Sequence, residues 1–297
     1  MTHHQRQQID QQLRALPRIA GATVDEQRRV YREMMSRFAV PDDIRIHEGT
    51  LADRRVLHVD RDREQRAGTI LFVHGGSHVL GSPETEMTLT GALVSRTGYS
   101  AISLDPRLAP EHPFPADTID VFAAYRALLD EGTDPATIAV AGDSAGGHLA
   151  VSILIQAKRA GLPQPAAAVL FSPGVDATRS GESIRTKDGI DPLLSARSLQ
   201  ANLDAYLAGA DPRQELLSPA ILVDPTGFPP LYISVGTNEV LLDDSTRLAQ
   251  RARDHDVDVI LDVVANVPHV FPTFHGVLNE ADEVLDRIAL FLRQRVG

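Results

Sequence analysis

The chain has 297 residues, of which 43% are hydrophobic, and carries a formal net charge of −11. A chain of this length can bury a large α/β core, organised as one domain or two. The negative charge argues against nucleic acid or an anionic membrane as the main partner, because both would repel the protein. Since cysteine is absent, there is no disulfide, no thiolate nucleophile and no cysteine-based zinc site.

Residues 1–8 are polar and lack the apolar core of a signal peptide. No apolar stretch approaches the roughly 18 residues that a membrane-spanning helix needs. We therefore expect a cytoplasmic protein that acts on a small molecule, with no membrane and no nucleic acid among its partners.

The first part of the chain predicts helices followed by a pair of strands. Residues 5–38 are polar with spaced apolar positions, which indicates one or two amphipathic helices. The apolar stripe consists of Val30, Met34, Met35 and Phe38. Pro41 ends this region, and alternating segments at 44–46 and 56–59 then predict a strand pair.

From residue 69 the pattern changes to short buried runs separated by helical stretches. The strand candidates are 69–73, 99–104, 138–140, 167–171, 231–235 and 257–261. Helices are expected around Val121–Leu128 and at 145–160, and a last helix begins at Asn279 with acidic residues in its first turn. This alternation predicts an α/β fold, with a mostly parallel central sheet flanked by helices.

The stretch between Phe171 and Leu231 is too long for a single crossover helix. Its apolar positions suggest helical material; they are Leu194, Leu199, Leu203, Tyr206 and Leu207. We expect this material to lie above the sheet and to form a helical cap together with the N-terminal helices. The chain then reads as a single domain, 1–297, whose cap elements are approximately 1–41 and 181–217.

The pentapeptide Gly142-Asp143-Ser144-Ala145-Gly146 lies between a predicted strand and a predicted helix. Gly-x-Ser-x-Gly at such a junction is a nucleophile elbow, a sharp turn that holds the serine hydroxyl above the sheet. Small neighbours are required because a Cβ there would collide across the turn. Ser144 is therefore the candidate nucleophile.

The turn His74-Gly75-Gly76-Ser77 follows the strand at 69–73. Consecutive glycines let the backbone approach a substrate closely, so we assign the oxyanion hole to Gly75, Gly76, Ser77 and Ala145. The expected donors are the amides of Gly76, Ser77 and Ala145. Alone, the turn would be read as an ordinary glycine-rich connection; its pairing with the elbow favours the catalytic interpretation.

A serine nucleophile also needs a base and an acid that orients it. His269, in the loop before the last helix, is the preferred base, and His275 is its rival. Glu239 is the first acid after the strand at 231–235 and keeps the order serine, acid, histidine. Asp243 is the next candidate, although an acid there also suits a helix start.

Other site chemistries have little support in the sequence. His74 and His78 are four residues apart, but two glycines lie between them and no third metal ligand is evident. Phosphate-loop and dinucleotide-binding fingerprints are absent. We expect neither a metal nor a cofactor.

These residues resemble the hormone-sensitive-lipase-like family of α/β-hydrolases, in its bacterial carboxylesterase branch. The matching motifs are His74-Gly75-Gly76, Asp105-Pro106-Arg107-Leu108-Ala109-Pro110-Glu111, Pro113-Phe114-Pro115, Gly142-Asp143-Ser144-Ala145-Gly146-Gly147 and Pro268-His269. They occur in the family's order over nearly the whole chain. The spacing from Ser144 to Glu239 and from there to His269 is also similar, which favours Glu239 over Asp243.

The resemblance implies hydrolysis of short acyl esters by a serine–acid–histidine triad, without a cofactor and under an N-terminal helical cap. Three positions depart from the family pattern. Ser77 replaces the third glycine of the oxyanion turn, Pro106 replaces a tyrosine, and Glu239 stands where aspartate is common.

The resemblance leaves alternatives open. The segments around Glu239 and His269 are also similar to terpenoid ε-lactone hydrolases, and amide hydrolysis needs the same triad. The family includes the gibberellin receptor, a non-catalytic binder that lacks the histidine, whereas this chain retains His269. By family analogy a homodimer is also conceivable.

Overall fold

The computed structural model describes residues 2–16, 22–63 and 65–297, and its centre is a sheet of eight strands. The strands are β1 (Ile44–Leu51), β2 (Arg54–Arg61), β3 (Thr69–Val73), β4 (Ser100–Leu104), β5 (Ile138–Asp143), β6 (Ala167–Phe171), β7 (Leu231–Gly236) and β8 (Val259–Val264). They are ordered β1-β2-β4-β3-β5-β6-β7-β8.

The sheet is mostly parallel, as the sequence predicted. β1 pairs antiparallel with β2, and β2 pairs antiparallel with β4, whereas all pairs from β4 to β8 are parallel. β1 and β2 run well beyond the predicted segments 44–46 and 56–59, because their hairpin pairing continues from Ile44↔Arg61 to Leu51↔Arg54.

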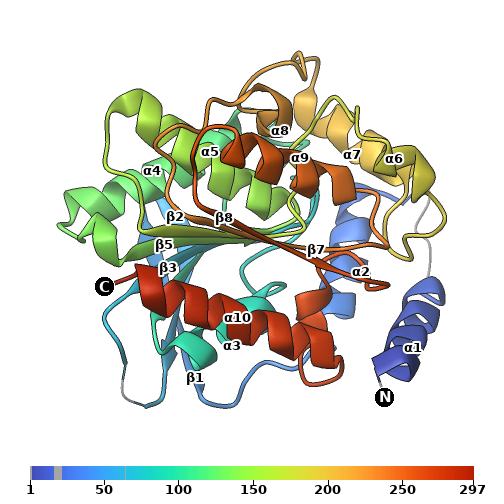
Figure 1. Cartoon of the computed structure of the whole chain (residues 1–297), viewed down its shortest axis with the longest axis horizontal. Coiled ribbons are helices and arrows are strands. Elements are labelled where there is room, and N and C mark those ends of the chain that lie inside the picture. The colour runs from blue at the N-terminus through green and yellow to red at the C-terminus, as the bar shows by residue number, and fades with distance from the viewer. Residues whose placement is uncertain (1, 17–21, 64) are drawn as a thin grey trace.

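Helices cover both faces of the sheet (Figure 1). They are α1 (Thr2–Arg14), α2 (Val24–Met35), α3 (Met87–Thr97), α4 (Ala116–Asp130), α5 (Ala145–Ala160), α6 (Ser183–Thr186), α7 (Ala196–Leu207), α8 (Pro219–Leu222), α9 (Leu242–Arg253) and α10 (Asn279–Arg295), with the 3₁₀ helices η1 (Pro135–Thr137) and η2 (Phe271–Phe274). α3 and α10 lie on one face, and α4, α5 and α9 lie on the other. Among the described helices, none has the length and apolar character to cross a membrane.

The strands divide their side chains between two apolar cores. In β3, Ile70 and Phe72 belong to the core under α3 and α10, while Leu71 and Val73 belong to the core under α4, α5 and α9. Burial on both faces explains why these strands are continuous apolar runs rather than alternating ones.

The N-terminal helices are attached to the main body by specific polar contacts. α2 begins at a capping box formed by Thr23 and Glu26, a pattern that stabilises helix starts. The Arg28 guanidinium on α2 donates from Nε to the Val79 carbonyl at 2.9 Å. The Tyr31 hydroxyl donates to the buried Glu86 carboxylate at 3.0 Å. Helices were predicted within 5–38; residues 17–21 of that range lie outside the described residues.

The turn from β5 into α5 is the most constrained part of the backbone. Ser144 has φ 51° and ψ −116°, a conformation that L-residues rarely adopt. A Cβ on Gly142 would lie 2.4 Å from the Gly146 carbonyl group, and one on Gly146 would lie 2.0 Å from the Val73 carbonyl oxygen. The glycines therefore let α5 start directly against β3, and this close approach fixes the strained serine.

Replacing Gly146 with alanine should destabilise the protein by about 3 kcal/mol or more, because the new methyl group meets backbone that cannot move independently. Urea unfolding followed by circular dichroism measures this change. Gly132→Ala is the matched control: its Cβ meets nothing within 4 Å, although its φ of 88° is positive. The control should cost only about 1–2 kcal/mol, and equal losses in the two variants would contradict the steric explanation.

Candidate active site

Ser144 lies where the carboxyl ends of the central strands meet, at the first turn of α5. Its amide donates to the Phe171 carbonyl at 2.8 Å, and its carbonyl accepts from the Gly174 amide at 3.0 Å. The strained residue is thus held by the end of β6 and by the loop that follows it. Its side chain lines a small cavity, and the positive end of α5 points toward the same place.

His269 and Glu239 form a buried pair in the loops that follow β8 and β7. His269 Nδ1 lies 2.8 Å from Glu239 Oε2, and the two side chains are 7% and 0% exposed. The carboxylate accepts, so Nδ1 carries the proton and Nε2 is left as the free base. This is the arrangement in which an acid orients a histidine for proton transfer.

Ser172 supports this pair, and the motif analysis did not identify it. Its hydroxyl donates to Glu239 Oε1 at 2.8 Å and accepts from the Val270 amide at 3.1 Å. Ser172 therefore connects the loop of the acid to the loop of the histidine. Its position directly after the buried strand β6 is the signal that could have indicated it, since ligand sites collect at that edge of parallel sheets.

The electrostatics of the pair follow from burial and from the mutual contact. Burial alone would lower the pKa of His269, but the hydrogen bond and charge of Glu239 outweigh it, so the pKa lies above its ordinary value. Burial raises the pKa of Glu239, while donation from His269, Gly236 and Ser172 favours its charged form. A carboxylate with three donors is well suited to stabilise an imidazolium.

Three backbone amides beside Ser144 are available to a substrate. Among the described residues, the amides of Gly76, Ser77 and Ala145 have no hydrogen-bond acceptor. Gly76 and Ser77 have φ of 114° and 54°, which turns the backbone sharply after β3. A serine in this conformation is strained.

Gly75 was included in the predicted oxyanion hole, but its amide is not available to a substrate. That N–H already donates to Asp143 Oδ1 at 2.9 Å, so it is not free to bind an oxyanion. Gly75 instead ties the oxyanion turn to the elbow, and a Cβ on it would lie 2.1 Å from Asp143 Oδ2. Burial raises the pKa of Asp143 to about 7, against the opposing effect of the Gly75 amide.

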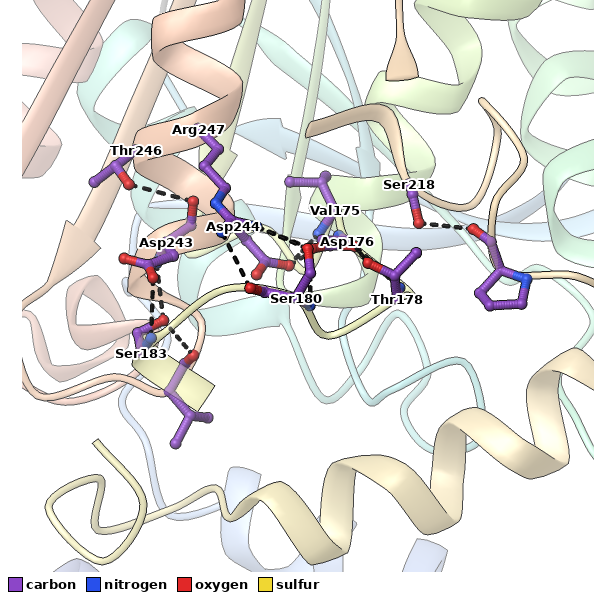
Figure 2. Close-up of polar contacts among 12 residues, drawn as sticks. Val175, Asp176, Thr178, Ser180, Ser183, Ser218, Asp243, Asp244, Thr246 and Arg247 are labelled. Atoms are coloured by element: carbon purple, nitrogen blue, oxygen red, sulfur yellow. Dashed lines mark hydrogen bonds and ion pairs between the residues drawn. The ribbon is translucent and has the colours of Figure 1, made fainter. Parts of the chain in front are cut away.

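The rival residues of the sequence analysis lie elsewhere. Asp243 accepts from the Ser183 amide at 2.9 Å and so anchors the start of α6 (Figure 2). Asp244 accepts from the Val175 and Asp176 amides at 2.8 and 2.9 Å. His275 follows η2, and its Nε2 has no partner in the described part of the chain.

A cavity of ≈ 30 Å³ opens beside Ser144. It is lined by Ser77, His78, Ser144, Ala145, His148, Gly174, Ala177, Arg179, Leu199, Leu203, Tyr206, Leu217 and Leu241. The leucines and Tyr206 come largely from the segment between β6 and β7, so the predicted insertion does contribute to the pocket. His78 donates from Nδ1 to Asp117 at 2.7 Å, and within the described residues no cluster of three or more potential metal ligands is found.

Comparison with known proteins identifies the family. A family model described as the alpha/beta hydrolase fold matches residues 70–273. This chain belongs to that family. The hydrolase is 42% identical to an acetyl-hydrolase from Streptomyces hygroscopicus over 237 residues, which cover 80% of this chain and 79% of the relative.

Two further comparisons indicate the class of hydrolase to which this protein belongs. An esterase from Acinetobacter venetianus is 38% identical over 226 residues, covering 75% of this chain and 73% of its own. A crystal structure of an esterase from the bacterial hormone-sensitive lipase family superposes with a TM-score of 0.93 at 36% identity, covering 99% of each chain. The protein is therefore a carboxylesterase-type hydrolase of this bacterial family, which confirms the resemblance.

The pH dependence of catalysis should depend on Glu239. Because His269 must be neutral to accept a proton and its pKa is raised, kcat/KM should rise with pH through a midpoint above about 6.5. Glu239→Gln removes the charge that raises this pKa, so the midpoint should move to lower pH while the plateau falls about 10²- to 10⁴-fold.

The measurement is a pH–rate profile of kcat/KM on p-nitrophenyl acetate. Asp243→Asn is the matched control, because Asp243 lies on the same segment but bonds to Ser183. An unmoved midpoint in Glu239→Gln would show that the carboxylate does not control His269.

Proposed function

We propose that the protein hydrolyses short-acyl carboxylic esters through the triad Ser144, His269 and Glu239 and an acyl-enzyme intermediate. The observation that carries this proposal is the buried His269–Glu239 hydrogen bond of 2.8 Å, at the sheet edge that also holds the strained Ser144. Core packing does not explain why Ser144 and the amides of Ser77 and Ala145 meet at one cavity, with a buried histidine–carboxylate pair at the same edge of the sheet.

In the first half-reaction the Ser144 oxygen attacks the ester carbonyl carbon while His269 Nε2 takes the hydroxyl proton. Glu239 stabilises the imidazolium that results and keeps Nδ1 as the donor toward itself. The imidazolium then gives its proton to the departing alkoxide, which leaves as the alcohol. The acyl group remains on Ser144 as an ester.

In the second half-reaction a water molecule replaces the alcohol. His269 takes a proton from the water, the hydroxide attacks the acyl carbon, and the proton returns to Ser144 as the carboxylic acid leaves. In both halves the carbonyl oxygen becomes negative, and the amides of Gly76, Ser77 and Ala145 are placed to donate to it. One such donor is typically worth about 3–4 kcal/mol of transition-state stabilisation.

The preference for small acyl groups is supported by the pocket. Its volume of ≈ 30 Å³ is small for a ligand site, so the cavity has little room beyond the reacting atoms. We assign the closure to a cap, approximately residues 1–41 and 181–217, in which α7 places Leu199, Leu203 and Tyr206 on the cavity. The name acetyl-hydrolase of the Streptomyces relative is consistent with this size.

Ser144→Ala should lower kcat on p-nitrophenyl acetate by about 10⁴- to 10⁶-fold, because no other group can form the acyl-enzyme. A fluorophosphonate probe should label the wild-type protein and leave the variant unlabelled. Ser36→Ala, at an exposed serine of the helix end, is the matched control and should retain labelling. Near-wild-type esterase activity in Ser144→Ala would refute the triad, and an unlabelled wild type would favour a non-catalytic binder.

Across a series of p-nitrophenyl esters, kcat/KM should be highest for acetate to butyrate and fall about tenfold or more by octanoate, since a longer chain must displace the leucines of α7. The same panel should include ε-caprolactone, because a lactone requires the same acyl transfer in a different shape. Faster turnover of the lactone than of any linear ester would overturn the linear-ester assignment and favour a lactone hydrolase.

A further inference from the structure

One cavity-lining residue has no function in the triad mechanism. Arg179 lines the same small cavity as Ser144, in the segment between β6 and α6. Its Nε and Nη1 atoms are buried and have no hydrogen-bond partner among the described residues. Leaving the donors of a buried guanidinium unpaired costs several kcal/mol, so such a group is expected to be compensated during function.

The backbone around Arg179 is built to hold it in place. Arg179 has φ 52°, in the left-handed region, and its amide donates to the Asp176 carbonyl at 3.1 Å. The Asp176 carboxylate accepts from the Thr178 amide at 2.9 Å and from the Ser180 hydroxyl at 2.7 Å (Figure 2). The residues on either side of Arg179 are thus both fixed by one buried carboxylate, which stabilises an otherwise unfavourable turn.

The nearby acids are already engaged with other donors. Asp176 pairs with Arg247, whose Nη1 lies 3.3 Å from its Oδ2, and it also receives the four donors of Thr178 and Ser180. Asp244 accepts two backbone amides, and burial raises its pKa to about 7 despite the opposing charge of Arg179. Neither acid fully compensates the guanidinium at neutral pH.

The other polar groups of the cavity are neutral or saturated. His78 is hydrogen-bonded to Asp117, which also accepts from the Tyr206 hydroxyl at 2.9 Å. Burial lowers the pKa of His148 to about 4, so this imidazole is uncharged at neutral pH. Arg179 therefore provides the positive charge of a pocket that is otherwise formed by hydroxyls, imidazoles and leucines, in a protein of net charge −11.

We propose that Arg179 is a specificity-determining residue that binds a carboxylate carried by the ester substrate, on either its acyl or its alcohol part. A carboxylate would accept the unpaired N–H groups in charge-assisted hydrogen bonds, which the planar guanidinium forms especially well. The ester chemistry is unchanged: the same carbonyl carbon is attacked, and the carboxylate takes no part in bond making. This inference rests on the proposed function and names the substrate class of that site.

The test compares two pairs of small esters that differ in one carboxylate. In the first pair, monoethyl succinate and ethyl butyrate, the charge is on the acyl side. In the second pair, 4-acetoxybutanoate and butyl acetate, it is on the alcohol side. Hydrolysis is followed by pH-stat titration, and the quantity measured is the ratio of kcat/KM for the charged ester to that for the neutral one. In Arg179→Met this ratio should fall about tenfold to hundredfold in at least one pair, which also identifies the side that carries the charge.

Arg247→Gln is the matched control, because it removes a cation of α9 that contacts the same turn through Ser180 but does not line the cavity. Its ratio should stay within about threefold of the wild type. Arg179→Lys keeps the positive charge but lacks the planar set of guanidinium donors, so the ratio of the two kcat/KM values should fall less than in Arg179→Met. It provides a second variant should Arg179→Met fold poorly.

The possible outcomes separate this inference from the proposed function. An unchanged ratio in both pairs for Arg179→Met, or an equal fall in Arg247→Gln, would overturn the carboxylate assignment and leave Arg179 as a structural neighbour of Asp176 and Asp244. Hydrolysis of the neutral esters by the wild type, lost in Ser144→Ala, would still support the proposed function in that case. Failure of the wild type on all four esters would instead refute the proposed function itself.

Discussion

The close approach of α5 to β3 is the constraint on which the site depends. Gly146 packs directly on the Val73 carbonyl, and the Gly75 amide donates to the buried Asp143 carboxylate. The proposed nucleophile and the amides beside it are therefore positioned by close backbone contacts and by one buried side chain. Such preorganisation is the main source of electrostatic catalysis, because the donors need not rearrange as charge develops. The strain at Ser144 is sustained by the same contacts.

The sequence predicted those parts of the structure that depend on short, local residue patterns. Continuous apolar runs predicted the parallel strands, and α5 and α10 begin where their first residues, Ala145 and Asn279, were expected. The residues that were missed act across loops from different strands. Ser172 reaches Glu239 and Val270, and the buried donors of Arg179 that lack a partner in the described part of the chain are evident only once its neighbours are placed. Gly75 was included in the predicted oxyanion hole, and sequence cannot show that Asp143 already accepts its amide.

Buried charge is distributed unevenly around the nucleophile. On one side, Glu239 and His269 compensate each other through a direct hydrogen bond. Beneath the elbow, burial raises the pKa of both Asp143 and Glu86, and the Tyr31 hydroxyl donates to Glu86. On the cavity side, Nε and Nη1 of Arg179 are buried donors without acceptors in the described part of the chain. The pair of Glu239 and His269 is closed by its own hydrogen bond, whereas the donors of Arg179 border the cavity beside Ser144.

The contacts of α2 connect this helix to the turn that follows β3. Arg28 holds the Val79 carbonyl, and the Val79 amide in turn donates to the carbonyl of Gly76 in the oxyanion turn at 3.1 Å. Two consecutive hydrogen bonds therefore link α2 to the turn that contains Gly76. On the proposed mechanism, a change in α2 is expected to act first on kcat, through the position of the Gly76 amide. A change in α7 is expected to act first on KM, through the side chains of Leu199 and Leu203 that line the cavity.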